Sequence, residues 1–477
     1  SYIGPIVKKY VEKILNILIT KGLNKEKFYI MQSNGGLLSP NDVIQKPVLI
    51  IESGPVAGIS GAVWLSKLVN STNTIYFDMG GTTAKAAIIR NFEPLLSREM
   101  WIEDLYYIGI PHIEVVEVGA GGGSIARIDE FGALRVGPQS AGAYPGPVCY
   151  HRGGTEPTVA DADLVLGYLD EDYFLGGEYK LDKNAAINAI KEKIADKLNV
   201  SVIEAALFIY RLVNVKMANA IRLASVRRGY DPAEHVLIVS GGAGPMHAGE
   251  LAQELGIKKI IVPPYPGNFS ALGLLTADIR YEEFKSKPAL LYSLDEKEII
   301  GIFNELEEKV RSVLIESGAK SSEIITYWQI DMRYSGQVHD VLVTVPKHKV
   351  SEDYRDDIAK AFSTKYFETY GYTLGKELIE TVTFRVIGTY PMPKPKVVAK
   401  NVTERSLDKA IVKTKNVYFE KLKDFVSTNV LNRDLIPINQ LIKGPAIIIE
   451  KTSTTVVPPN ATFYIDELGN IIINLNP

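Results

Sequence analysis

An aspartate followed by small and hydroxyl residues, Asp78-Met79-Gly80-Gly81-Thr82-Thr83, forms a group that could do chemistry. Apolar stretches at 74–78 and 86–89 flank it, so we expect a strand, a tight turn and a second strand, not a strand that leads into a helix. The backbone amides and threonine hydroxyls of such a turn would bind anionic oxygen, while Asp78 would hold Mg²⁺ through water or orient an attacking water. The alternative is a β-turn in which Asp78 only hydrogen-bonds its own turn.

A second glycine-rich stretch, Ser240-Gly241-Gly242-Ala243-Gly244-Pro245, lies between an apolar strand at 235–240 and a helix that we expect to continue to Leu255. Glycines allow a ligand to approach the backbone, and a helix N-terminus favours anions, so this stretch could hold phosphate or an adenosine. The alternative is a tight connection between strand and helix. His247 falls in the first turn of that helix, where we expect a surface or capping role.

These turns need elements to hold them, and the patterning predicts an α/β layer around the second turn. Ser201-Val202-Ile203-Glu204 is a capping box, in which the serine and glutamate side chains bind exposed backbone amides. It predicts the start of a helix that ends near Gly229. The strand, the glycine turn, the helix and a further strand at 259–262 then follow without a gap. We place domain boundaries to give three segments: 1–286, 287–400 and 401–477.

The composition is that of an ordinary globular protein. The chain has 477 residues, a formal net charge of −3 and one cysteine. Because lysine and arginine are spread along the chain, we expect neither a nucleic-acid partner nor a membrane surface. The apolar runs are too short to cross a bilayer, and a single cysteine fits a reducing, cytoplasmic environment.

The two glycine turns together resemble the second half of the sugar-kinase, actin and heat-shock ATPase superfamily. With its other loops, the whole chain resembles the A subunit of ATP-dependent hydantoinases, 5-oxoprolinases and ketone carboxylases. The segments that carry the resemblance are 78–83, 119–126, 137–150, 158–167, 241–247, 270–273, 333–337 and 444–446. The resemblance implies an α/β fold class, with a ribonuclease H-like lobe of the actin/sugar-kinase/heat-shock ATPase type followed by an α+β C-terminal domain.

Two features depart from the family pattern. Lys85 stands where the family commonly has an aspartate, and a lysine there could neutralise phosphate but not ligate Mg²⁺; a surface lysine on a strand is the alternative. Family members also usually carry another lobe before the position of Ser1, with an Asp-x-Gly-Gly-Thr turn of its own. We therefore expect this chain to hold half of an ATP site, with the other half cut away or supplied by a separate polypeptide.

The resemblance also implies metal candidates. It suggests a metal or structural site that includes Cys149, and His112 and Glu114 stand two residues apart on a predicted strand, so these three could form a zinc site. Packed polar residues are the alternative. Asp161 and Asp163 belong to a segment that the family places near the cleft, so one of them could bind Mg²⁺. Helix capping is the alternative for both.

The function that the resemblance implies is that of a subunit of an ATP-dependent cyclic-amide hydrolase. Such a subunit binds ATP and phosphorylates the carbonyl oxygen of a small-molecule substrate, and a hydantoinase B-like partner completes the reaction. The implied cofactors are ATP and Mg²⁺, with Mn²⁺ or Zn²⁺ as other metals. Asp78 and Thr82 would be catalytic, Gly80, Gly81, Thr82 and Thr83 would bind phosphate, and Gly241, Gly242, Ala243 and Gly244 would bind the nucleoside side. A subunit of an acetone-type ketone carboxylase and a non-catalytic scaffold subunit are the alternatives.

Overall fold

The computed structural model describes residues 2–24, 27–102, 105–347, 349–396, 398–399 and 404–476. The chain divides into two compact units, and each unit combines two separate stretches of sequence. The larger unit contains 54–276 and 394–477, and the smaller contains 1–53 and 277–393. This division differs from the three expected segments. The first 53 residues belong to the smaller unit, together with 277–393. The C-terminal stretch, 394–477, belongs to the larger unit, together with the glycine-rich region.

A nine-stranded sheet forms the centre of the larger unit, and five of its strands follow the order β10-β4-β3-β13-β14. The strand β3 (Asn73–Met79) pairs antiparallel with β4 (Ala84–Arg90), which pairs antiparallel with β10 (Val116–Val118). On its other side, β3 pairs parallel with β13 (Val236–Ser240), and β13 pairs parallel with β14 (Lys259–Val262). Three antiparallel strands followed by two parallel ones make the ribonuclease H-like arrangement that we expected. The α/β fold class is confirmed.

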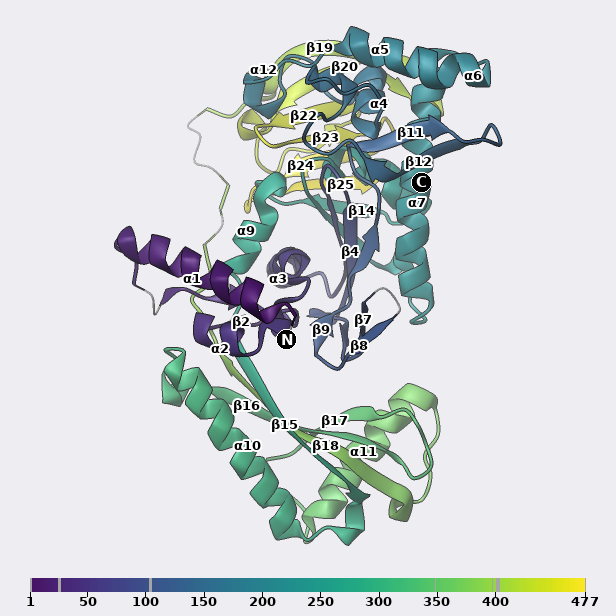
Figure 1. Cartoon of the computed structure of the whole chain (residues 1–477). Helices are drawn as coiled ribbons and strands as arrows, with labels where there is room; N and C mark the ends of the chain where they lie inside the picture. The colour runs from purple at the N-terminus through teal and green to yellow at the C-terminus, as the bar shows by residue number, and fades with distance from the viewer. Residues whose placement is uncertain are drawn as a thin grey trace. The chain divides into compact units, whose positions relative to one another are not determined.

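The C-terminal stretch extends this sheet and adds a second one (Figure 1). Antiparallel pairing continues from β14 through β25 (Ile471–Leu475) and β24 (Ala461–Ile465) to β21 (Ile442–Lys443). The second sheet has four strands: β19 (Ile411–Phe419), β20 (Asp424–Asn432), β22 (Ala446–Glu450) and β23 (Ser453–Val457). The apolar strand residues are buried, so they stabilise the join by removing apolar surface from water.

Helices cover both faces of the nine-stranded sheet. Ile75 and Phe77 of β3 belong to the core that contains residues of α4 (Val159–Leu166), α7 (Val202–Val226) and α8 (Gly244–Glu254). Tyr76 points to the opposite face, since strand residues alternate, and its hydroxyl lies against Gly58 of α3 (Ser53–Leu68). The helix α7 begins after the predicted capping box, in which Ser201 Oγ accepts from the Glu204 amide and the Glu204 carboxylate accepts from the Ser201 amide. That prediction is confirmed.

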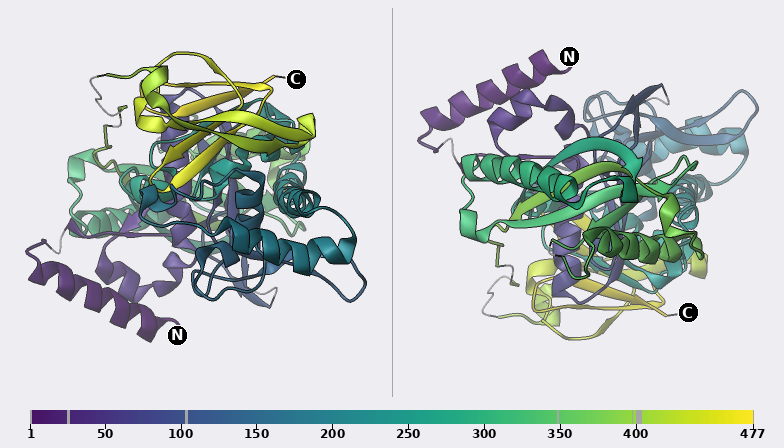
Figure 2. Two further views of the ribbon diagram at one scale, coloured as in Figure 1. Left: turned by 90° about the horizontal axis from the view of Figure 1, so that it is seen from above. Right: turned by 90° about the horizontal axis from the view of Figure 1, so that it is seen from below.

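The smaller unit is a six-stranded sheet with two helices on one of its faces. Its strands, in sheet order, are β1 (Ile30–Met31), β2 (Leu37–Leu38), β15 (Ile279–Leu290), β18 (Ile379–Tyr390), β16 (Ile325–Tyr334) and β17 (Val341–Val345). Trp328 and Tyr334, on the buried side of β16, contact α10 (Glu296–Glu316) and α11 (Tyr354–Tyr370). Phe303 of α10 stacks on Trp328 with ring centroids 4.4 Å apart, and Phe362 of α11 meets Tyr334 edge-on at 5.0 Å. Figure 2 shows the two helices on this sheet.

The N-terminal helix α1 (Gly4–Thr20) belongs to the smaller unit and has Val11 as its one buried residue. Among the described residues, no single helix combines the length and the apolar composition needed to cross a membrane. The bent pair 183–198 and 202–226, which meets at 89°, has that length and composition only when its two helices are counted together.

Candidate active site

The two predicted glycine turns lie side by side in the larger unit. Since β3 and β13 are parallel neighbours with Asp78 opposite Ser240, the turns that follow these strands leave the same edge of the sheet. The Ala243 amide donates a hydrogen bond of 3.0 Å to the Met79 carbonyl. Gly241 has a φ of +87°, and a Cβ there would lie 2.2 Å from the Met79 oxygen, so this position requires glycine. The structure therefore brings Gly80–Thr83 and Gly241–Gly244 together.

A third loop, Gly119–Ser124, packs against the first turn. The amides of Gly122 and Gly123 donate to the carbonyls of Gly80 and Gly81, at 3.1 and 2.6 Å. A Cβ on Gly121 would lie 2.6 Å from the Gly81 carbonyl carbon. The two backbones thus touch with no room for a side chain between them. The sequence marked this loop as part of the resemblance but assigned it no place in the site.

The turn between β22 and β23 forms another wall, which the sequence analysis did not predict. Ser453 Oγ donates to the Gly242 carbonyl at 3.3 Å and lies 3.4 Å from the Gly241 carbonyl. A Cβ on Gly267 would lie 2.7 Å from Thr452 Oγ1. Because this turn comes from the C-terminal stretch, only the tertiary fold places it beside the glycine turns.

These loops enclose a cavity of about 450 Å³. The residues that line it are of two kinds. The first kind comprises glycines, other small residues and residues with a hydroxyl group: Gly80, Gly81, Thr82, Gly122, Gly123, Gly142, Ala143, Pro147, Ala160, Gly242, Ala243, Thr452, Ser453 and Thr454. The second kind is larger: Tyr150, Leu169, Asp170, Tyr173, Phe174, Leu175, Met246, Glu450 and Lys451.

Backbone amides of the first kind are available to a ligand. Within the described part of the chain, the amides of Gly81, Thr82 and Gly242 have no hydrogen-bond partner. Helix α8 also begins here, with Ala243 as its N-cap residue and no side chain that caps it. Amide donors and a helix N-terminus both stabilise negative charge, so the donor set fits an anion such as phosphate. The volume lies in the range of small-molecule sites.

Asp78 stands next to the cavity and not among the residues that line it. Its carboxylate lies on the face of β3 that carries Tyr76, whose hydroxyl is 3.4 Å from Asp78 Oδ2 and 2.7 Å from Ser240 Oγ. Burial raises the pKa of Asp78, and the Tyr76 hydroxyl and the charge of Lys85 partly offset this effect. Lys85 itself is paired with Glu117, with 3.8 Å between Nζ and Oε1.

Asp161 is fully engaged in holding the fold. Its carboxylate accepts from the amides of Val148, Cys149 and Thr158 at 3.2, 2.7 and 2.8 Å, and from the Thr158 hydroxyl at 2.8 Å. With Thr158 it forms the capping box of α4. The structure therefore favours the capping role that the sequence left open beside Mg²⁺ binding.

Asp163 and His247 form a pair that has no exposure to solvent. Asp163 Oδ2 lies 3.5 Å from His247 Nε2, and the imidazole stacks on Tyr210 with ring centroids 4.9 Å apart. The expected surface or capping role of His247 is wrong, because the side chain turns inward between α4, α7 and α8. The pattern did not reveal this, because the first turn of a helix exposes some residues and buries others.

The zinc candidates are not brought together. Among the residues that the structure describes, no group of three or more histidine, cysteine, aspartate or glutamate side chains could hold a metal ion. His112 Nδ1 lies 3.2 Å from the Ile110 carbonyl, and Glu114 pairs with Arg228. Cys149 is buried next to Asp161, and both factors raise the pKa of its thiol well above the usual range. Local partners thus account for all three side chains.

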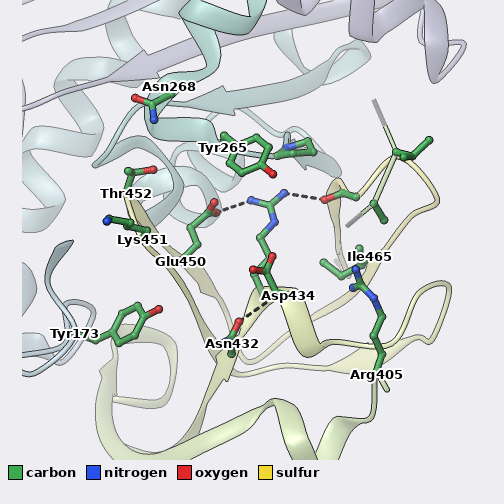
Figure 3. Close-up of a pocket in the computed structure, with 15 residues that line it drawn as sticks. Tyr173, Tyr265, Asn268, Arg405, Asn432, Asp434, Glu450, Lys451, Thr452 and Ile465 are labelled. Atoms are coloured by element: carbon green, nitrogen blue, oxygen red, sulfur yellow. Dashed lines mark hydrogen bonds and ion pairs between the residues drawn. The ribbon is translucent and has the colours of Figure 1, made fainter. Parts of the chain in front are cut away.

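A second cavity, of about 340 Å³, shares Tyr173 and the turn Glu450–Thr452 with the first one (Figure 3). Arg433 lines this cavity and is buried; it donates to Glu450 at 2.5 Å and to the carbonyls of Val262 and Gly469 at 2.9 Å. Its guanidinium therefore binds the protein itself, and it anchors the β22 end of the shared turn.

Several known proteins are similar to this chain in sequence and in fold. Residues 1–283 match the family described as Hydantoinase/oxoprolinase, and residues 293–475 match the Hydantoinase/oxoprolinase C-terminal domain. The chain is 33% identical to the caprolactamase subunit alpha of Pseudomonas jessenii, over 98% of this chain and 67% of that protein. The crystal structure of the ATP-dependent caprolactamase from the same organism superposes with a TM-score of 0.84 at 32% identity, over 100% of this chain and 69% of the other. A nucleotide-free acetone carboxylase gives a TM-score of 0.83 at 28% identity, over 98% and 67%. The chain thus spans about two thirds of the length of these relatives.

Proposed function

Since the chain belongs to the hydantoinase/oxoprolinase family, we propose that it is the nucleotide-handling subunit of an ATP-dependent cyclic-amide hydrolase. The observation that carries the proposal is the cavity beside the two glycine turns, where the amides of Gly81, Thr82 and Gly242 have no partner among the described residues. These donors, together with the N-terminus of α8, suit a chain of phosphates. The relative named caprolactamase supports an amide as the second substrate.

The chemistry explains why such an enzyme needs ATP. An amide resists water because its nitrogen donates electrons into the carbonyl group. When bound, ATP would supply the phosphoryl group that turns the carbonyl oxygen into a leaving group. The chain's own task is then positioning and charge neutralisation. In our proposal, the amides of Gly81 and Thr82 hold the phosphate oxygens and the Thr82 hydroxyl adds a donor. Gly242 and Ala243, at the N-terminus of α8, would lie at the nucleoside end of the phosphate chain.

Asp78 has a supporting role in this proposal. It lies at the end of β3 directly before the phosphate-binding turn, where it would hold Mg²⁺ through water or orient an attacking water. Its position outside the cavity lining suits contact through a water molecule, not direct contact. A hydantoinase B-like partner subunit would complete hydrolysis, in line with the relative that is named a subunit.

A glycine substitution tests the proposal. Gly81 lines the cavity, and a Cβ on it would meet nothing within 4 Å, so Gly81→Val should fold normally and fill the phosphate end. We expect its affinity for ATP, measured by titration calorimetry on the chain with its native partners, to fall at least about tenfold. Gly301→Ala is the matched control, since Gly301 has equal space around its Cβ and lies in α10 of the smaller unit. Unchanged ATP affinity in Gly81→Val would contradict the proposed site.

Substrate-stimulated ATP turnover separates the candidate functions. We expect turnover of the purified complex to rise with a cyclic amide such as caprolactam, 5-oxoproline or hydantoin. Turnover that instead requires acetone and bicarbonate would make the chain a carboxylase subunit, which the similarity to acetone carboxylase also favours. If the complex binds no nucleotide, a non-catalytic scaffold subunit would be the remaining candidate function.

A further inference from the structure

Lys451 is the one lysine or arginine among the described residues that line the first cavity. It occupies the turn between β22 and β23, next to Thr452 and Ser453, which also line the cavity. Figure 3 shows Lys451 at the tip of this turn, with its side chain directed away from the second cavity. A cavity whose other donors are neutral amides and hydroxyls therefore has, among the described residues, a single cationic side chain on its wall.

The backbone that carries Lys451 is held in place relative to the amide donors. Two residues later in the chain, Ser453 Oγ hydrogen-bonds to the Gly242 carbonyl. The side chain of Thr452 packs so closely on Gly267 that a Cβ there would lie 2.7 Å from Thr452 Oγ1. The stem of Lys451 passes over Gly176, where an added Cβ would lie 3.2 Å from its Cγ. The backbone is thus anchored, while the amino group remains exposed to solvent.

The present partner of Lys451 is one that it can easily leave. Its Nζ lies 2.8 Å from Glu178 Oε1, and the two side chains are 70% and 68% exposed. Ion pairs with such exposure contribute little to stability, because water and salt screen them. An anion held by the backbone amides would therefore compete well with Glu178.

The other charged side chains of the cavity wall are already paired and are far less exposed than Lys451, at 3% for Asp170 and 13% for Glu450. Asp170 lies 2.9 Å from Lys413 and 3.5 Å from Lys415. Glu450 accepts from buried Arg433. Breaking one of these ion pairs would leave a buried charge unpaired, and this costs far more free energy than breaking the exposed pair of Lys451 and Glu178. Lys451 is thus the charge on this wall that can respond to a ligand.

We propose that Lys451 leaves Glu178 and binds the phosphate oxygens of a nucleoside triphosphate in the cavity, and that Glu178 competes with the ligand for it. The inference rests on the proposed function, from which it takes the ligand. It assigns the cation that neutralises the phosphates to the C-terminal stretch, far in sequence from both glycine turns. It also gives Glu178, an exposed residue outside the cavity, a defined effect on affinity.

The test compares ATP with adenosine, which has no phosphates, by calorimetry on the full chain with its native partners. Lys451→Gln should weaken ATP binding about tenfold, the loss expected when one charged donor to phosphate is removed, and should leave adenosine binding unchanged. Lys451→Arg should retain ATP affinity within about threefold. Glu178→Gln should tighten ATP binding about twofold, because it removes the competing acceptor. Lys443→Gln, at an exposed lysine on β21, is the control and should bind as the wild type does.

Each outcome bears on a different statement. If the wild-type complex binds neither ATP nor adenosine, the proposed function fails. If the wild type binds ATP and Lys451→Gln binds it equally well, or loses ATP and adenosine affinity to the same extent, the inference about Lys451 is wrong. Weaker ATP binding by Glu178→Gln would likewise contradict the competition. Circular dichroism of each variant verifies that the fold is intact.

Discussion

Asp78 carries a carboxylate that the fold keeps partly away from water, beside the Tyr76 hydroxyl and opposite Lys85 on the neighbouring strand. Burial raises its pKa from the ordinary value of 3.8, so the protonated form is favoured in the folded state relative to the unfolded state. Ionised Asp78 therefore lowers stability at neutral pH. A residue that destabilises the fold and lies next to a candidate site is typical of one that serves function.

We predict that Asp78→Asn abolishes substrate-stimulated ATP turnover and raises the unfolding temperature at pH 7 by a few degrees. The neutral amide avoids the cost of a partly buried charge, and this cost is present above the folded pKa of Asp78 and disappears as the pH falls below 3.8. The stability gain should therefore shrink as the pH is lowered from 7 towards 3.8, as measured by thermal unfolding at a series of pH values. Glu93→Gln, at an exposed carboxylate on β5 (Glu93–Pro94), serves as the control. Full turnover in Asp78→Asn would remove Asp78 from the mechanism.

For single residues, the sequence predicted which residue types form the site better than it predicted how buried each side chain is and what it contacts. The residues of the two glycine turns lie together as expected, because each turn directly follows a strand and the two strands are neighbours. His247 was expected near the surface and is fully buried. Lys451 and Ser453 were not identified as site residues, because nothing in their local pattern separates them from any other hairpin turn. Burial and long-range contacts are properties of the fold, and single residues do not encode them.

Among the elements, α4 shows how a short helix can position a site. It has eight residues, and its first turn carries Ala160 into the cavity wall. Asp161 fixes this turn by accepting from the loop that contains Val148 and Cys149. The helix thus holds together the loop on one side of the cavity and the loop Gly119–Ser124 on the other, where the Ala160 amide donates to the Gly122 carbonyl at 2.7 Å.

We predict that Asp161→Asn destabilises the protein by about 2–4 kcal/mol, because a buried amide accepts through one oxygen where the carboxylate accepts from four donors. Urea denaturation with and without Mg²⁺ measures this effect. If Asp161 is structural, the loss should be the same in both conditions. A loss that appears only with Mg²⁺ present would restore Asp161 as a metal ligand. Asp129→Asn, in the exposed turn between β11 (Ser124–Ile128) and β12 (Leu134–Ser140), is the control and should cost much less.

Elements with a strong local signal were predicted well. The capping box fixed the start of α7, and the strand, turn and strand around Gly80 were recognised from their apolar flanks. The expected boundary near 286 was drawn inside what is one strand, β15 (Ile279–Leu290). That strand pairs with β18 along its length and with β2 at Ile279. Such pairing depends on partners distant in sequence, which alternation of residue types alone does not reveal.

The whole molecule is assembled from interleaved stretches, and this explains why the three expected segments differ from the two units. The C-terminal stretch contributes β25 to the edge of β14, where Ile260 and Ile473 pair and both are fully buried. It also brings Lys451 and Ser453 to the cavity. A boundary placed from composition divides the chain into consecutive segments, whereas each compact unit combines two stretches that are distant in sequence.

The interleaving leads to a prediction for a shortened chain that ends at Pro393. Without the stretch 394–477, β14 would lose its antiparallel partner and expose a row of unpaired backbone groups together with Ile260 and Val262. The glycine turns would also lose the Ser453 hydrogen bonds. We expect the shortened chain to aggregate or to unfold without a cooperative transition, as measured by circular dichroism during heating and by binding of a hydrophobic dye.

Addition of the stretch 394–477 as a separate chain during expression should restore soluble protein, since the contacts are non-covalent. A shortened chain that unfolds cooperatively and binds ATP with wild-type affinity would show that the C-terminal stretch is dispensable for the site, and would contradict both the assignment of the β22–β23 turn to the cavity wall and the role proposed for Lys451.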